Sequence, residues 1–344
     1  MNRYMTKGMS KKAVLLARRK ALKPLRVLYG DYVILCEDKS GRKVVLKTDN
    51  VQRENEIYDV LVKHFDPKRW PSLDIVHFLD YADGYIVMEY VEGIDPNQEI
   101  LDGEQDVMRF REFPLIVRAF WELKDFLAAT AGPVAAIDVE TTKPGEPTVY
   151  EWLRLKPERW SEMAAKKFGA DYLLRPATRR AVEDALATQV KNPVLQRPLV
   201  PQFGVYGPHQ MIIRDGRVVL FDFGGHLKWR PELYDAVWPL WWQLLHFKED
   251  WLAPDRRRNL HRYIKMYSDA FWWQAPDEYK KELGRGGYDT LFTAVLVERL
   301  VGCHIDILRR PDNHLREQPD SYVGKLSDMV NDLLLYYAGE FKHM

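Results

Sequence analysis

The chain has 344 residues, of which 46% are hydrophobic and 29% are charged, a composition typical of a globular protein long enough for two compact lobes. Its formal net charge is +1, so charge gives no reason to expect a nucleic-acid partner. Two widely separated cysteines, the lack of a signal peptide and the lack of any apolar run of about 18 residues favour a cytoplasmic protein without a membrane span.

Residues 1–24 form a basic N-terminal segment, because no acidic residue precedes Asp31. The stretch MSKKAVLLARRKAL predicts a helix within it. The default interpretation is a solvated helix that packs Val14, Leu15 and Leu22 on the body of the protein. The alternative is a basic amphipathic helix that contacts an anionic surface.

Residues 25–92 are predicted to form a small β-rich lobe. Short runs rich in Val, Leu and Tyr, separated by glycine-containing turns, predict strands, and helical spacing after the third run predicts one helix. The expected order is three strands in an antiparallel meander, a helix and two more strands. Their ranges are 24–30, 31–38, 42–48, 49–65, 74–81 and 84–91.

Residues 93–344 are predicted to form a mainly helical lobe. Apolar spacing predicts helices at 113–127 and 175–190, and the Thr-, Pro- and Gly-rich segment 130–150 is expected to be a loop. A hairpin is expected at 210–222, followed by three or four long helices rich in aromatic residues. Their helical spacing favours core packing over a ligand cage.

A β-rich lobe with one helix, joined by a short hinge to a helical lobe with an embedded hairpin, is the layout of the protein-kinase-like fold. Lys47 ends the third strand, from which its ammonium group can reach the α- and β-phosphates of a nucleotide. Glu54, in the next helix, is the candidate ion-pair partner of this lysine. Glu56 is a rival, because the two residues lie on opposite faces of the helix and only one can point inward.

The stretch FDFGG, residues 221–225, follows the predicted hairpin. Asp222 is placed there to chelate Mg²⁺ between the β- and γ-phosphates of a nucleotide such as ATP. Upstream, the turn where backbone N–H groups would cradle phosphates offers only one glycine, Gly30.

The chain resembles the aminoglycoside phosphotransferase and choline kinase branch of kinase-like enzymes. The stretches that carry the resemblance are RENEIYDVL (53–61), VMEYVEG (87–93), FGVYGPHQMI (203–212), FDFGG (221–225) and RPELYDAVWPL (230–240). The resemblance implies an α+β bilobal fold, with a small antiparallel sheet in the N-lobe and a larger, mainly helical C-lobe. It also implies that the hinge residues Met88, Glu89 and Tyr90 hold adenine and that ATP (or another nucleoside triphosphate) and Mg²⁺ are bound. The acceptor stays open between a small molecule and a protein.

The catalytic loop departs from the family's His-Gly-Asp-Leu-Gly-Pro-His-Asn pattern. Phe203 replaces the histidine, Val205 replaces the aspartate that accepts the substrate's proton, and Gln210 replaces the asparagine that ligates the second metal. Valine cannot accept a proton, and a positioned acid–base group contributes about 10²–10⁴ in rate. Glutamine offers the same carbonyl oxygen one methylene further out. His209 and His226 are candidate replacements for the base, although a structural role in the loop is the default for both.

Three functions therefore stay open. The favoured one is a pseudokinase-like protein that binds a nucleotide and a protein partner. The second is an active, atypical ATP-dependent phosphotransferase that acts on a hydroxyl group of a small molecule. The third is an interaction protein that binds no nucleotide.

Overall fold

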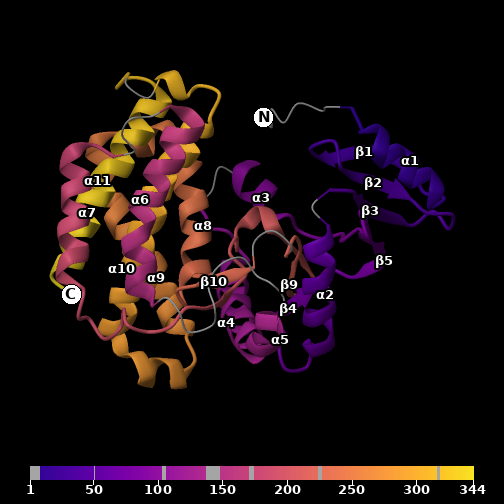
Figure 1. Cartoon of the computed structure of the whole chain (residues 1–344), viewed down its shortest axis with the longest axis horizontal. Helices are drawn as coiled ribbons and strands as arrows, with labels where there is room; N and C mark the ends of the chain where they lie inside the picture. The colour runs from indigo at the N-terminus through magenta and orange to yellow at the C-terminus, as the bar shows by residue number, and fades with distance from the viewer. Residues whose placement is uncertain are drawn as a thin grey trace.

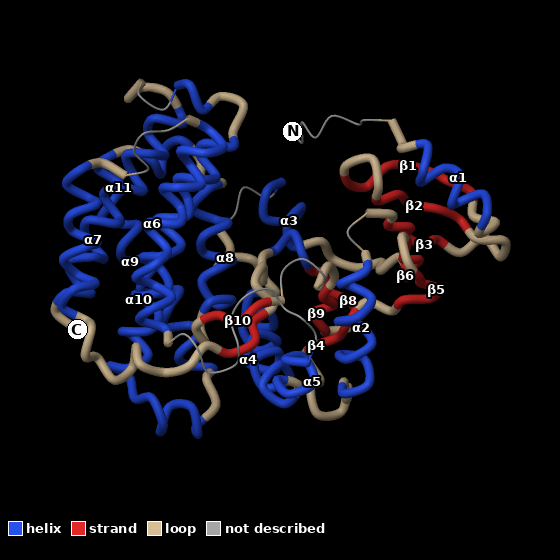
Figure 2. Tube along the Cα trace, in the orientation of Figure 1, coloured by secondary structure: helices blue, strands red, loops and turns tan. Residues whose placement is uncertain are grey.

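A computed structural model describes residues 8–49, 51–102, 106–136, 148–169, 174–223, 227–315 and 318–344. Figure 1 shows a small lobe built on a sheet at one end and a larger helical lobe at the other. Figure 2 shows that the strands of the small lobe and those of the central hairpin form separate groups. The architecture is the predicted bilobal α+β arrangement.

The N-lobe contains an antiparallel five-stranded sheet in the order β1-β2-β3-β6-β5. Its elements are α1 (Lys11–Arg19), β1 (Lys23–Tyr29), β2 (Val33–Glu37), β3 (Lys43–Lys47), α2 (Gln52–His64), β5 (Phe78–Ala82) and β6 (Tyr85–Glu89). The meander β1-β2-β3 follows the predicted order, because β2 and β3 are short apolar runs that pack on both faces of the sheet.

Helix α1 covers the outer face of this sheet. Ala13 and Ala17 are fully buried against it, because their small side chains allow the helix to approach closely. The expectation that Leu15 packs on the body is wrong: its side chain is 55% exposed. It lies on the opposite side of the helix from the two alanines, among basic residues.

The strand expected at 74–81 is divided into two. β4 (Leu73–Ile75) leaves the N-lobe and pairs in parallel with β9 (Arg217–Leu220) of the hairpin, whereas β5 stays in the N-lobe sheet. One continuous strand was the wrong prediction, because the partner of β4 lies about 140 residues further along the chain, beyond the reach of any local pattern.

The C-lobe is mainly helical, as predicted. Its elements are α3 (Pro96–Asp102), α4 (Phe113–Ala129), α5 (Ala131–Ala136), α6 (Val149–Phe168), α7 (Pro176–Thr188), β7 (Val200–Gln202), β8 (Met211–Arg214), β9, β10 (Lys228–Arg230), α8 (Tyr234–Leu245), α9 (Arg257–Gln274), α10 (Asp277–Arg309) and α11 (Tyr322–Lys342). Short 3₁₀ turns lie at Pro208–Gln210, Glu249–Leu252, Pro254–Arg256 and Asn313–Leu315. The loop expected at 130–150 is wrong at 131–136, where α5 forms; residues 137–147 lie outside the described part.

The hydrophobic core fills the C-lobe. Most aromatic residues of the last four helices are buried in it, as predicted, although Trp273 is 73% exposed. Among the described residues, no helix is both long and apolar enough to cross a bilayer.

The hinge is fastened to the hairpin. Ile94 and Ile213 exchange two backbone hydrogen bonds of 2.9 and 2.8 Å. Gly93 is required beside them, because a Cβ atom there would lie 2.3 Å from the carbonyl oxygen of Ile213. Arg214 of β8 donates to the carboxylate of Glu89 at 2.7 Å, so an ion pair also joins the N-lobe to the hairpin.

Candidate functional site

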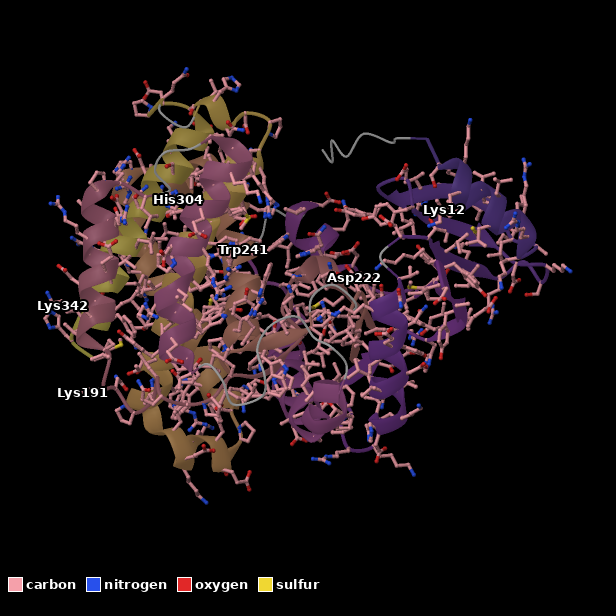
Figure 3. The ribbon with its side chains drawn as sticks, in the orientation of Figure 1. Lys12, Lys191, Asp222, Trp241, His304 and Lys342 are labelled. Carbon is pink, nitrogen blue, oxygen red and sulfur yellow. The ribbon has the colours of Figure 1, made fainter. Side chains whose placement is uncertain are left out.

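Three charged side chains, two from the N-lobe and one from the residue after β9, meet between the lobes. The Nζ atom of Lys47 lies 2.5 Å from Oε2 of Glu54 and 2.6 Å from Oδ1 of Asp222. Burial alone would lower the pKa of Lys47, but the two carboxylates outweigh it and raise the pKa, so the ammonium group stays charged. Figure 3 shows Asp222 between the N-lobe and the helical lobe.

The local structure explains why these side chains converge. Lys47 pairs with Ile86 at the end of β3, which places it at the inner edge of the sheet. On α2, Glu54 is 1% exposed and lies on the same stripe as the buried Ile57 and Leu61. The rival Glu56 is exposed, so Glu54 is the residue that meets the lysine.

Asp222 follows β9 in a conformation that few residues adopt. Its φ angle is +67°, in the left-handed region that aspartate tolerates better than most residues but that still costs free energy. Gln210 faces it, with Nε2 donating to Oδ2 at 3.4 Å. The structure therefore brings together the two residues that the sequence nominated as metal ligands.

The loop at 203–210 buries the apolar side chains at its start. Phe203 is fully buried and packs edge to face on Phe223, with ring centroids 4.8 Å apart. Val205 is 7% exposed. Gly204 adopts a φ of +90°, which its lack of a Cβ atom permits. The side chains that replace the histidine and the aspartate are thus part of the core.

A buried carboxylate holds this loop from below. Oδ1 of Asp235 accepts a hydrogen bond from the backbone N–H of Gly204 at 2.7 Å. Burial raises the pKa of Asp235 to about 7, although the hydrogen bonds from the loop backbone act in the opposite direction. Since Asp235 is 1% exposed and faces the loop backbone, it positions the loop and does not itself reach a substrate.

Of the two candidate histidines, the described part of the chain includes only His209. His209 is exposed and its ring folds back over Gly207, where an added Cβ atom would lie 2.7 Å from the ring. This contact favours a role in the loop structure. His226 lies outside the described residues.

The turn after β1, which the sequence predicts to cover phosphates, contains a residue that the sequence analysis did not nominate. At Gly30 φ is +57°, and an added Cβ atom would lie 2.6 Å from the ring of Tyr32. Burial raises the pKa of Tyr32, and the charges of Lys47 and Asp222 also act on its hydroxyl group. The backbone N–H of Thr48, next to Lys47, donates to the carbonyl oxygen of Tyr32 at 3.0 Å, so Tyr32 is a neighbour of the site. An aromatic residue two positions after a single glycine was the available signal.

The predicted hinge residues line the inner face of the N-lobe sheet. Met88 is 7% exposed and belongs to an apolar cluster with Val45, while Tyr90 packs against that cluster. The side chain of Glu89 accepts from Arg214 and from the backbone of residue 77, and its pKa is lowered because these hydrogen bonds outweigh its burial.

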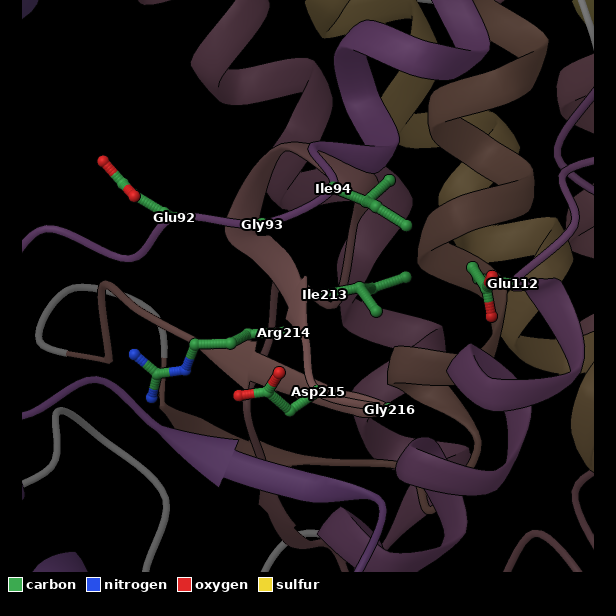
Figure 4. Close-up of a pocket in the computed structure, with 8 residues that line it drawn as sticks. All are labelled: Glu92, Gly93, Ile94, Glu112, Ile213, Arg214, Asp215 and Gly216. Carbon is green, nitrogen blue, oxygen red and sulfur yellow. The ribbon is translucent and has the colours of Figure 1, made fainter.

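A cavity of about 320 Å³ lies beside the hinge (Figure 4). Its walls are the hinge at 92–94, the tip of the hairpin at 213–216 and Glu112. Neither Lys47 nor Asp222 contributes to it, so this cavity is separate from the charged cluster. In the structure these two side chains bond directly to each other.

Comparison with known proteins shows the fold. APH(2")-IIia in complex with GDP and kanamycin superimposes with a TM-score of 0.57 at 13% identity, over 96% of this chain and 99% of that chain. A thermostable mutant of aminoglycoside phosphotransferase APH(4)-Ia with ADP and hygromycin B gives 0.54 at 13% identity, over 95% and 99%. Macrolide 2'-phosphotransferase MphH from Brachybacterium faecium gives 0.53 at 16% identity, over 86% and 92%.

The chain thus has, across nearly its full length, the bilobal fold of aminoglycoside and macrolide phosphotransferases. No protein-family model matches the sequence, and no curated protein matches it either. At these low sequence identities the structural similarity establishes the fold alone, so the activity has to be inferred from the site.

Proposed function

We propose that this protein binds a Mg²⁺-nucleotide between its lobes and that its capacity for phosphoryl transfer is impaired. One contrast carries the proposal. The ammonium group of Lys47 and the carboxylate of Asp222 are assembled at 2.6 Å, whereas the position of the family's proton acceptor holds the buried Val205.

The donor set fits a nucleotide with its metal. Lys47 would hold phosphate oxygens, and Asp222 with Gln210 would supply oxygen ligands to Mg²⁺, which commonly takes one or two protein ligands and fills the rest with phosphate and water. The amide of Gln210 would have to turn so that its Oε1 atom points to the metal. Binding would replace the Lys47–Asp222 ion pair, and the apolar cluster around Met88 would receive the base.

Thermal unfolding with ATP, with and without Mg²⁺, tests this proposal. A ligand at 100 times its dissociation constant stabilises a protein by about 2.7 kcal/mol. We expect Asp222→Asn to lose the Mg²⁺-dependent part of this stabilisation. Asp83→Asn is the matched control, because Asp83 is exposed in the turn between β5 and β6 and does not line the cavity beside the hinge. No stabilisation by any nucleotide would refute the proposal.

An active phosphotransferase is the second candidate, favoured by the completeness of the Lys47–Glu54–Asp222 cluster. Phosphoryl transfer depends mainly on positioning and charge, so loss of the base alone lowers the rate without abolishing it. Metal-dependent ATP turnover by the wild-type protein that Asp222→Asn lacks would favour this candidate over the impaired one.

A further inference from the structure

Six side chains of the helical lobe form a closed ring in which cations and aromatic rings alternate. They come from α6, β10, α8 and α10. In order around the ring they are Lys156, Trp152, Arg230, Tyr234, Arg299 and Trp160. Each aromatic residue contacts two cations, at distances of 4.8 to 5.8 Å from the cationic group to the ring centroid. We call this set the cation–aromatic ring.

The ring carries more positive than negative charge. Glu298 pairs with Arg299 through two hydrogen bonds of 2.6 and 2.7 Å and accepts from Trp160 at 3.2 Å. It therefore neutralises one of the three cations. Within the described part of the chain, neither Lys156 nor Arg230 forms an ion pair with a carboxylate. Two unneutralised, half-buried cations thus contact the same indole ring.

The ring also leaves hydrogen-bond donors unused. The indole N–H of Trp152, that of the adjoining Trp238 and the Nε–H of Arg230 are buried and have no acceptor. Trp152 is 3% exposed and Trp238 is 8% exposed. Each buried donor without a partner costs about 1–3 kcal/mol. All three groups are donors, so a single anionic ligand would satisfy the kind of hydrogen bond that is missing.

The lowered pKa of Lys156 also favours anion binding at the ring. The pKa of Lys156 is lowered to about 8, chiefly by burial; the charge of Glu298 acts against this effect, and the positive charges of Arg230 and Arg299 add to it. The cationic form of this lysine is therefore destabilised in the protein alone, and a bound anion would restore it.

The ring lies beside the loop at 203–210. Arg230 pairs with Val200 in the two-stranded sheet that leads into this loop. Tyr234 precedes Asp235, which accepts from the backbone of Gly204. In the view of Figure 1, β10 and α8 lie between the hairpin and the helices α6 and α10. Lys156, Trp160 and Arg230 are partly exposed, so solvent reaches part of the ring.

We propose that the cation–aromatic ring binds the phosphate or carboxylate group of a small molecule, with Lys156 and Arg230 as its direct contacts. This site goes beyond the nucleotide site and does not require it. If the protein also binds a nucleotide as proposed above, a hydroxylated ligand anchored here is the candidate acceptor; this role rests on that proposed function.

The test measures thermal unfolding with inorganic phosphate, glycerol phosphate and glycerate, against sodium chloride at equal ionic strength and against uncharged glycerol. We expect saturable stabilisation by an anion, and the phosphate and carboxylate arms identify the preferred group. Lys156→Gln and Arg230→Gln should each weaken it about tenfold or more, because each removes a charge-assisted hydrogen bond. Arg154→Gln, exposed on the same helix, should leave it unchanged.

Two further measurements separate the alternatives. The anion effect should persist in Lys47→Met, which shows that the phosphate does not act at the nucleotide site, and ATP stabilisation should persist in Lys156→Gln. Without ligand, Lys156→Gln should not lower the melting temperature, since it removes an unpaired cation. No effect beyond sodium chloride, or an effect retained in both glutamine variants, would overturn the proposal and leave the ring as a packing feature. If Arg230→Gln fails to fold, the partly exposed Lys156 carries the test.

Discussion

Replacing Glu54 by glutamine gives a quantitative test of the charged cluster. Glu54 is 1% exposed, and its partner Lys47 has a side chain that is 11% exposed. Removing one member of a buried ion pair costs about 3–5 kcal/mol. Asp222 stays bonded to the lysine and is 31% exposed, so it offsets part of the loss. We therefore expect Glu54→Gln to lower the free energy of unfolding by about 2–3 kcal/mol.

Glu56→Gln is the matched control, since Glu56 lies two residues away on the exposed face of the same helix. The same chemical change there should alter the free energy of unfolding by no more than about 0.5 kcal/mol. Urea denaturation followed by tryptophan fluorescence measures both variants. Equal losses in the two variants would show that Glu54 and Lys47 are not a buried pair in solution, and the assembled site would have to be abandoned.

Three other substitutions probe the loop and the hinge. Asp235→Asn should reduce the pH dependence of the free energy of unfolding. The pKa of Asp235 is about 7 in the folded protein and about 3.9 in the unfolded chain, so the folded state holds this proton more tightly. The stability that results is present at low pH and is lost as the pH rises to about 7. Burial also raises the pKa of Asp306 to about 6, so the fall in melting temperature across that range should be smaller in Asp235→Asn than in the wild type. Phe203→His should cost more than about 2 kcal/mol in a urea titration, because it buries an imidazole at a fully buried site; an unchanged midpoint would contradict this. Arg214→Gln should cost about 0.5–1 kcal/mol, since its pair with Glu89 is partly exposed; a cost above 2 kcal/mol would mean that this pair dominates the lobe contact.

The order of elements in the N-lobe could be predicted because local signals agree there. β2 and β3 are short, continuous apolar runs that are buried on both faces of the sheet, and glycine turns separate the strands. Two elements were not predicted: one depends on pairing with a distant strand, and the other has a composition that suggests a loop. β4 is fixed by its pairing with β9, which no local pattern encodes. α5 has the sequence AGPVAA, whose glycine and proline suggest a loop, yet proline is tolerated in the first turn of a helix.

The site shows the same division. Lys47 and Asp222 could be nominated from motifs, and the choice of Glu54 over Glu56 was available from the sequence, because Glu54 shares the helical stripe of Ile57 and Leu61. The cation–aromatic ring could not be found in this way. Its members come from four elements spread over about 150 residues, and only the fold brings them together.

The loop at 203–210 and the charged cluster differ in what stabilises them. On the loop, Phe203 and Val205 pack in the core, which stabilises the fold whether or not a ligand binds. The cluster of Lys47, Glu54 and Asp222 is different, since buried ion pairs are weak sources of stability and well-packed apolar residues of similar volume often serve as well. Asp222 adds the cost of a left-handed backbone. Packing explains the apolar residues of the loop without any ligand. It does not explain why three charged side chains lie between the lobes, where burying them costs free energy. An anion-and-metal ligand does account for them, because it would exchange the Lys47–Asp222 contact for phosphate on the lysine and metal on the aspartate.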